Sequence, residues 1–164
     1  MSADAAAPGA RLLAQWKRWH RVPGGRRVFS WLVGRNARYT GTIGARIVEL
    51  RPGFARATMG DRPLVRNHLK SIHAVALVNF AEVVSGLAML TALPAGARGI
   101  VTGLSIEYLK KARGTLMAES TVILPELGGS TTLEVGATVR DGSGDEVARA
   151  RVRWLVRLAP EAGT

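Results

Sequence analysis

The sequence predicts an α+β fold in which an antiparallel sheet of about six strands wraps around one long apolar helix. Residues 71–93 form a single apolar run, long enough for about six helical turns. Strand-like segments lie on both sides of this run and follow one another directly, with short turns between them. No alternation of strands with further long helices occurs, which favours an antiparallel over a parallel sheet.

We expect residues 1–38 to form a basic N-terminal segment with short helices, and residues 39–159 to form the folded domain. The first forty residues carry a net charge of +7, whereas the remainder carries +4. Residues 1–10 are small and rich in alanine, which is typical of a chain end without fixed structure. Charge and composition therefore distinguish the N-terminal segment from the rest of the chain.

Two short helices are expected in this segment, over residues 11–21 and 26–35, separated by Pro23-Gly24-Gly25. The first is basic and amphipathic, because its leucines and tryptophans recur at helical spacing between Lys and Arg residues. Such a helix could lie on a membrane surface, act as a lid, or pack over the edge of the sheet. We favour packing, since one helix with two leucines anchors only weakly.

Strands are predicted at residues 40–50 and 54–61, joined by Arg51-Pro52-Gly53, in which Pro and then Gly suit the centre of a type II turn. Four more strand-like runs follow the long helix, at residues 100–109, 115–124, 132–140 and 146–158. The last alternates arginine with apolar residues most regularly, and Asp141-Gly142-Ser143-Gly144 is its expected hairpin turn.

The long helix between these strands has Ser71 as its expected N-cap. It is apolar nearly all round, so either protein or a lipid bilayer must enclose it, and roughly 20 residues would span a bilayer. Polar residues inside it, such as Asn79 and Ser85, and the strand-like flanks favour enclosure by protein.

Length and composition limit the classes of function. A chain of 164 residues with 47% hydrophobic residues predicts one globular domain with a substantial core. The absence of cysteine excludes disulfides and thiolate catalysis, and no metal or other cofactor is expected. Nucleic acid is not an expected partner despite the net charge of +11, because aromatic residues make up only 5%. The N-terminus lacks a signal-peptide pattern, which predicts a cytoplasmic location.

The candidate chemistry rests on one spacing: Asn67, His73 six residues later, and Glu82 nine residues after that. A carboxylate in an apolar helix is costly unless it is paired or used, which makes Glu82 the first candidate. His73 and Ala74 lie in the first turn, where backbone N–H groups have no partner within the helix. Nine helical residues turn through about 900° and rise about 13 Å, which separates Glu82 from His73. Both residues can serve one site only across a two-fold dimer interface.

This spacing resembles that of the hotdog-fold acyl-CoA thioesterases of the phenylacetyl-CoA type. Their pattern is an Asn, a His-Gly-Gly at the helix start and an Asp, matched here with Glu82 in place of Asp. The likeness covers about residues 39–157 and is greatest to a poorly characterised bacterial branch of hotdog proteins. The features of that branch are Pro23-Gly24-Gly25-Arg26 with Phe29-Ser30, Arg66-Asn67-His68, and the run from Tyr108 to Gly114. The resemblance implies the hotdog fold, which agrees with the order of elements.

The resemblance also implies roles for these residues. Glu82 would act as base or nucleophile across the dimer interface, with Asn67 orienting the carboxylate or the attacking water. The backbone N–H groups of His73 and Ala74 would hold the oxyanion, and Ala74 adds a methyl group where the family has glycine. A hydroxyl that places the water in some of these enzymes aligns with Val101, and the adjacent Thr102 is expected to face the other side of its strand.

Coenzyme A would need a basic rim for its phosphates. Lys110, Lys111 and Arg113 are candidates at the turn after the strand that follows the helix, and Arg66 and Arg98 are weaker ones. The alternative interpretation of the Lys-Lys-x-Arg run is a solvated loop.

Two functions from different classes follow. The first is hydrolysis of an acyl-CoA or a related acyl thioester by a homodimer or tetramer with shared sites. The alternative is a non-catalytic hotdog module that binds acyl-CoA or fatty-acid ligands. A dehydratase is disfavoured, because its usual His and carboxylate arrangement fits this spacing no better. Structural roles stay open as well: Glu82 could pair with a buried arginine or with Asn79, and His73 could cap the helix.

Overall fold

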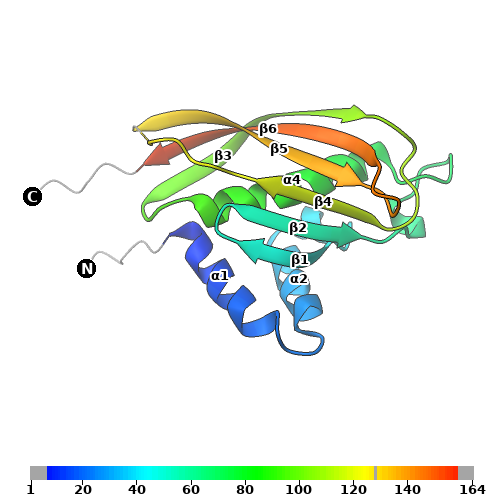
Figure 1. Cartoon of the computed structure of the whole chain (residues 1–164), viewed down its shortest axis with the longest axis horizontal. Helices are drawn as coiled ribbons and strands as arrows, with labels where there is room; N and C mark the ends of the chain where they lie inside the picture. Colours follow the sequence, from blue (N-terminus) through cyan, green and yellow to red (C-terminus); the bar gives the residue numbers. More distant parts are fainter. Residues whose placement is uncertain (1–6, 128, 159–164) are drawn as a thin grey trace, which may run out of the picture.

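The computed structural model describes residues 7–127 and 129–158. One antiparallel sheet of six strands, in the order β1-β2-β4-β5-β6-β3, curves around the long helix α4 (Figure 1). The strands are β1 (Arg46–Arg51), β2 (Phe54–Met59), β3 (Ala97–Tyr108), β4 (Leu116–Thr121), β5 (Ser130–Arg140) and β6 (Glu146–Leu158). The helices are α1 (Pro8–Trp19), α2 (Gly25–Asn36), α3 (Arg38–Gly41), the 3₁₀ turn η1 (Pro63–Val65) and α4 (Ala74–Ala92). The predicted α+β fold is confirmed.

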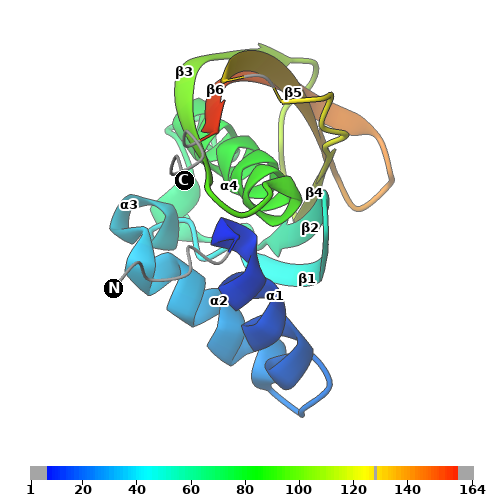
Figure 2. The same cartoon turned by 90° about the vertical axis from the view of Figure 1, so that its left-hand side faces the viewer.

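The core lies between α4 and the concave face of the sheet. Figure 2 shows α4 inside the curve of the sheet, with α1, α2 and α3 on the other side of the helix. Phe80, Val84 and Met89 of α4 are fully buried, as are Leu116 and Val152 of the facing strands. Helix α4 is long and apolar enough to cross a membrane, yet most of it is buried within the protein. It is therefore the core helix of a soluble-type α+β fold, as the polar residues inside it indicate.

The two predicted N-terminal helices are confirmed as α1 and α2. Helix α1 begins at Pro8, before the expected residue 11, so the unstructured segment predicted for residues 1–10 is wrong for its last residues; residues 1–6 lie outside the described part. Proline suits a helix start because its missing N–H would have no partner there. Trp16 meets Phe29 edge to face at 5.2 Å, and both are buried in the same core as the sheet.

Helix α1 packs against α4 and α2 packs against the edge strand β1. Gly9 permits the first contact, since a Cβ there would lie 2.4 Å from the carbonyl oxygen of Leu90. The favoured packing role of the first helix is thus observed, mainly on α4 rather than over the sheet edge. The expected domain boundary between residues 38 and 39 stays a prediction, because the N-terminal helices and the sheet share one core.

The strand predicted for residues 40–50 is wrong over its first half. Residues 38–41 form the short helix α3, and β1 begins only at Arg46, after a turn in which Gly44 has a φ of 59°. Alternating residue types before Arg46 do not extend the strand, because left-handed backbone at Gly44 interrupts the extended path.

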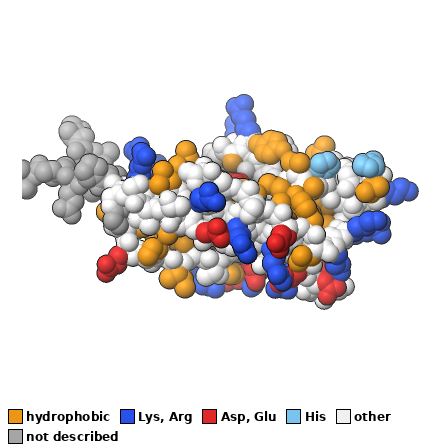
Figure 3. Space-filling view, turned by 90° about the horizontal axis from the view of Figure 1, so that it is seen from above, with side chains coloured by type: hydrophobic (Ala, Val, Ile, Leu, Met, Phe, Trp, Pro, Cys, Tyr) orange, Lys and Arg blue, Asp and Glu red, His pale blue; other side chains and the backbone are white. Residues whose placement is uncertain are grey.

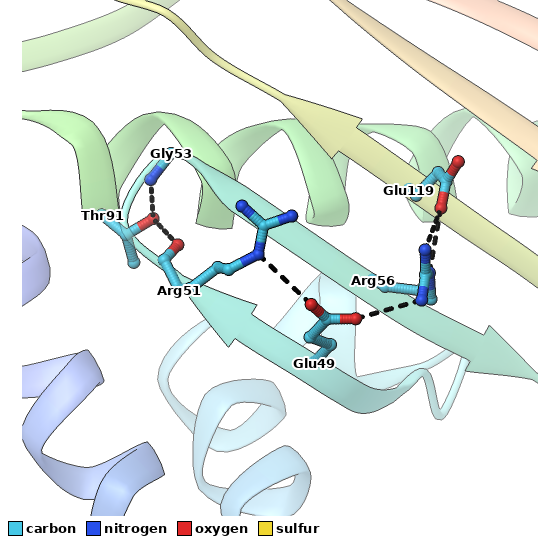
Figure 4. Close-up of polar contacts among 6 residues, drawn as sticks. All are labelled: Glu49, Arg51, Gly53, Arg56, Thr91 and Glu119. Carbon is cyan, nitrogen blue, oxygen red and sulfur yellow. Dashed lines mark hydrogen bonds and ion pairs between the residues drawn. The ribbon is translucent and has the colours of Figure 1, made fainter.

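The turn between β1 and β2 is the predicted Pro52-Gly53 turn, with φ of 71° at Gly53. Figure 4 shows how it is tied to the last turn of α4: the Gly53 N–H donates to Thr91 Oγ1 at 3.2 Å, and the Thr91 hydroxyl lies 3.2 Å from the Arg51 carbonyl. Next to it, Arg56 bridges Glu49 and Glu119 across β1, β2 and β4. The buried hydroxyl of Thr91 therefore holds the β1–β2 edge of the sheet against the core helix.

The four strands predicted after the helix are confirmed, with β6 matching its expected bounds and the other ends moving by a few residues. Strand β3 begins at Ala97, earlier than expected, and pairs along its length only with β6 among the described residues. Its second edge, twelve residues long, is therefore unpaired within the described part of this chain.

Candidate active site

The start of α4 is capped by His73 rather than by Ser71, so the predicted N-cap is wrong. The His73 Nδ1 atom accepts a hydrogen bond from the Val75 N–H at 3.1 Å. Ser71 is instead buried in the preceding loop, where its N–H and hydroxyl both reach the Asn67 side chain. The alternative in which His73 caps the helix is therefore the one observed.

Of the two predicted oxyanion donors, only one is free. The His73 N–H donates to the Val65 carbonyl at 2.8 Å, whereas the Ala74 N–H has no acceptor in residues 7–127 and 129–158. Ala74 is the first residue of the helix and is exposed, so its N–H and the positive end of the helix dipole face solvent. An unpartnered N–H in this position can bind an anion or a developing oxyanion.

The segment after β3 braces this helix start. Ile72 donates its N–H to the Ala112 carbonyl at 2.8 Å, and the Tyr108 hydroxyl donates to the Ala74 carbonyl at 3.2 Å. Asp61 accepts from both Arg66 and the Gly114 N–H, which links the loop before the helix to the same segment. The hydrogen bond from Arg66 lowers the pKa of Asp61, so this carboxylate stays ionised at neutral pH.

Asn67 organises the loop that leads into the helix. Its Oδ1 atom accepts hydrogen bonds from the N–H groups of Leu69 and Ser71, at 2.9 and 3.2 Å, and from the Ser71 hydroxyl. This oxygen is therefore engaged within its own loop, while the predicted role beside the carboxylate or the water stays a prediction.

Glu82 is the only charged residue of α4. Its carboxylate forms no hydrogen bond or ion pair with a described residue, and burial raises its pKa above the ordinary value. Pairing with Asn79 is wrong, because the Asn79 amide donates to the Tyr39 carbonyl at 3.2 Å. A half-buried carboxylate with a raised pKa is the property expected of a catalytic base.

Trp154 of β6 and Glu82 both lie close to Gly86, and Trp154 was not singled out by its sequence. An added Cβ at Gly86 would lie 3.8 Å from the Trp154 ring and 3.9 Å from Glu82 Oε1. The Trp154 Nε1–H is buried and has no hydrogen-bond partner in the described structure. The one available clue was that Trp154 is the single aromatic residue in the alternating pattern of β6. A Cβ at Gly86 would make only ordinary van der Waals contacts, so close packing within this chain does not require glycine at this position.

Glu82 lies on the side of α4 that the protein leaves partly open. Val78, Glu82 and Gly86 are half-buried and Val75 is 50% exposed, whereas most of the remaining helix is buried. On the neighbouring unpaired edge, Ile100 of β3 is 63% exposed. Hydrophobic side chains gather on the face seen in Figure 3 and extend toward the histidines. Exposed apolar residues beside an unpaired strand edge are typical of a surface that another chain covers.

A cavity of about 320 Å³ opens at the helix start. It is lined by residues of α3, of the loop around η1 and of the first turns of α4: Tyr39, Thr42, Ile43, Leu64, Val65, Arg66, His73, Val75, Ala76 and Asn79. Its volume and mainly apolar wall suit a small ligand group. Glu82 is not part of this wall, so one chain brings together the helix start and the cavity but not the carboxylate.

The predicted coenzyme A contacts divide into two groups. Lys110 is held by Asp141 and Asp145, each at 2.7 Å, and Arg66 is held by Asp61 at 2.6 Å. Lys111 and Arg113 are exposed and form no ion pair with a described residue, so they remain available for a phosphate. The expected neighbour of the water site, Thr102, sits at a register shift of β3, where its hydroxyl donates to the Arg153 carbonyl at 3.3 Å.

No group of three or more His, Asp or Glu side chains within the described residues is placed to hold a metal ion. The arrangement offers a carboxylate with a raised pKa and a free helix-start N–H, two elements that acyl transfer from a thioester to water requires.

Solved structures share this architecture. A protein from a structural-genomics programme is 32% identical, with a TM-score of 0.79 over 92% of this chain and 100% of its own. A probable thioesterase from Pseudomonas aeruginosa is 22% identical, with a TM-score of 0.69 over 78% of this chain and 92% of its own. A thioesterase from Haemophilus influenzae is 17% identical, with a TM-score of 0.64 over 76% of this chain and 87% of its own. These last two structures show a shared fold.

The hotdog fold and the resemblance to hotdog-fold thioesterases are thereby confirmed, whereas the phenylacetyl-CoA type is not. No curated protein matches the sequence. The profile of the family described as "Domain of unknown function (DUF4442)" matches residues 25–156, and the chain therefore belongs to this family.

Proposed function

We propose that the protein hydrolyses acyl thioesters, with acyl-CoA as the substrate class, at two equivalent sites of a homodimer. The observation that carries the proposal is Glu82: a carboxylate on the open side of an apolar helix, unpaired among the described residues and raised in pKa by burial. The thioesterase names of proteins with the same fold support it.

Each site combines Glu82 of one subunit with the helix start of the other. Ala74 and Glu82 are eight residues apart on one helix, about 12 Å along its axis, which a glutamate side chain cannot span. Pairing of β3 with its copy across a two-fold axis would cover the unpaired edge and bring two α4 helices past each other. Such a dimer places a carboxylate near each Ala74 N–H.

The reaction then follows from the properties of these groups. The Glu82 carboxylate takes a proton from water while the water oxygen attacks the thioester carbonyl carbon. The Ala74 N–H, aided by the helix dipole, stabilises the oxyanion that forms. Collapse of this intermediate breaks the C–S bond, and protonated Glu82 returns the proton to the thiolate. Lys111 and Arg113, next to the helix start, hold the phosphates of coenzyme A.

Two observations favour the alternative function, an acyl-thioester binding module without turnover. The Asn67 oxygen is engaged in its loop, and the Thr102 hydroxyl donates to Arg153, so neither is free to place the water in this conformation. The alternative differs from hydrolysis only in the fate of the bound thioester.

The decisive experiment measures thiol release from short, medium, long and aromatic acyl-CoAs for wild type and Glu82→Gln. We expect turnover of at least one class, with a loss of about a hundredfold or more in Glu82→Gln, the magnitude typical of removing a general base. Saturable acyl-CoA binding without turnover in either protein would support the binding module. Equal turnover by both proteins would show that Glu82 is not the base.

A further inference from the structure

A second cavity, of about 460 Å³, lies between α2, the turn that follows α3, and β1. It shares no lining residue with the cavity at the helix start. Ile47 and Val83 give it buried apolar walls, and Trp31, 59% exposed, contributes an aromatic side chain. This volume lies within the roughly 300–1,000 Å³ of small-molecule sites.

The polar lining of this cavity is positive. Arg27, Arg35 and Arg46 line it, and no aspartate or glutamate does so among the residues that the structure describes. An adjoining cavity of about 470 Å³ repeats Arg27 and Arg46, adds Arg26, and likewise contains no described acidic residue. The two cavities therefore form one concave basic region along α2 and β1.

These arginines are not neutralised by the rest of the described chain. The ion pairs of residues 7–127 and 129–158 use other cations: Arg51, Arg56, Arg66, Lys110, Arg140, Arg149 and Arg151. Arg35 instead lies over the Trp31 ring, 5.5 Å from its centroid. Three unpaired guanidinium groups around one concave space produce a strong local positive potential, which an anionic ligand would balance.

We propose that this cavity binds a small phosphate-bearing ligand of nucleotide size. Guanidinium groups bind phosphate oxygens through paired N–H donors, a geometry that the ammonium of lysine cannot reproduce. The volume exceeds what a single phosphate fills, and the Trp31 ring offers an apolar face for a planar group. A free ligand is favoured over a membrane surface because the arginines surround a concavity with buried walls rather than a flat face.

The site does not depend on the proposed hydrolysis. None of Glu82, Ala74, Lys111 and Arg113 lines the cavity, so it is separate from the contacts proposed for the thioester and for the phosphates of coenzyme A, of which ADP is a part. Glu82→Gln should therefore bind both probes as wild type does. Loss of hydrolysis and loss of this site can thus be told apart.

The test is isothermal titration calorimetry of the full chain with pyrophosphate and with ADP. We expect saturable binding to wild type that weakens at least tenfold in Arg27→Gln/Arg46→Gln. Both positions are exposed, so the variant should fold as wild type does, which thermal melting verifies. The matched control is Arg153→Gln/Arg157→Gln, which removes two exposed arginines of β6 that have no described ion pair, and we expect less than a twofold change. Arg27→Lys/Arg46→Lys keeps the charge and should weaken binding at least threefold.

Three results would overturn the proposal. The first is an equal loss of affinity in the β6 control, and the second is unchanged affinity in the lysine variant, because either would assign binding to net charge alone. The third is absence of saturable binding of both probes to wild type, including the case in which vesicles of anionic phospholipid bind instead.

Discussion

Glu82 is held in the folded protein with its charge poorly solvated, which links activity to stability at a single residue. Because burial raises its pKa, the folded state binds the proton more tightly than the unfolded state does. Stability therefore falls as pH rises from the ordinary carboxyl pKa of 4.5 through the raised pKa of the folded state.

Glu82→Gln should remove this dependence. We expect the variant to become progressively more stable than wild type as pH rises from 4 toward 8, measured by urea unfolding across that range. Glu126→Gln is the control, since Glu126 is exposed and forms no ion pair with a described residue. A stability difference that does not change with pH in Glu82→Gln would contradict the raised pKa of this carboxyl.

Two substitutions at His73 distinguish a role in capping the helix from a role in the chemistry. His73→Ala removes the acceptor for the Val75 N–H and should cost about 1 kcal/mol in the free energy of unfolding, as loss of an N-cap does. His73→Asn keeps a good N-cap and should retain wild-type stability and thioester hydrolysis within about threefold. Chemical denaturation and the thiol-release assay measure both. A stable His73→Asn protein without activity would assign the imidazole to the chemistry.

At the scale of elements, Thr91 joins the end of α4 to the β1–β2 turn. Thr91→Val keeps the shape of the side chain but leaves the buried Gly53 N–H without its acceptor, which should cost about 1–3 kcal/mol of unfolding free energy. Thr91→Ser keeps the hydroxyl and serves as the matched control. Amide hydrogen exchange at Gly53 should be faster in Thr91→Val and remain slow in Thr91→Ser; equal protection in both would show that the turn is held by other contacts.

At the scale of the whole molecule, the proposed site exists only between two subunits. Ala74→Pro removes the free N–H at the first helical position, where proline is well tolerated and where His73, with ψ of 140°, already has a suitable conformation. We expect Ala74→Pro and Glu82→Gln each to be folded dimers with little activity.

Mixing these two variants tests the shared site directly. After unfolding together and refolding, half of the dimers should contain one of each chain, and each mixed dimer has one intact site. Activity should return to about one quarter of the wild-type value. Refolding each variant alone is the control. No recovery in a mixture shown by light scattering to be dimeric would place both groups of a site in the same chain.

The locally determined parts of the fold were predictable from particular segments. The apolar run that became α4, the Arg-alternating β6 and the Pro52-Gly53 turn each carry their signal in neighbouring residues. The start of β1 was mispredicted because the left-handed turn at Gly44 and the α3 contacts interrupt a pattern that reads as continuous. Asp61 also braces the helix start by accepting from the Gly114 N–H, and this contact gave no local signal because Gly114 is 53 residues away.

By itself, the sequence determined the α+β class, the core helix and the position of the candidate carboxylate, because hydrophobic periodicity and turn chemistry are properties of adjacent residues. Only the tertiary structure decided which polar groups remain free. It joined Lys110 to Asp141 and Asp145 and gave the His73 N–H to Val65. It left the Ala74 N–H without a described acceptor, and the side chains of Glu82, Arg27, Arg35 and Arg46 without a described ion pair. Whether a polar group is free depends on residues that folding brings close from other parts of the chain.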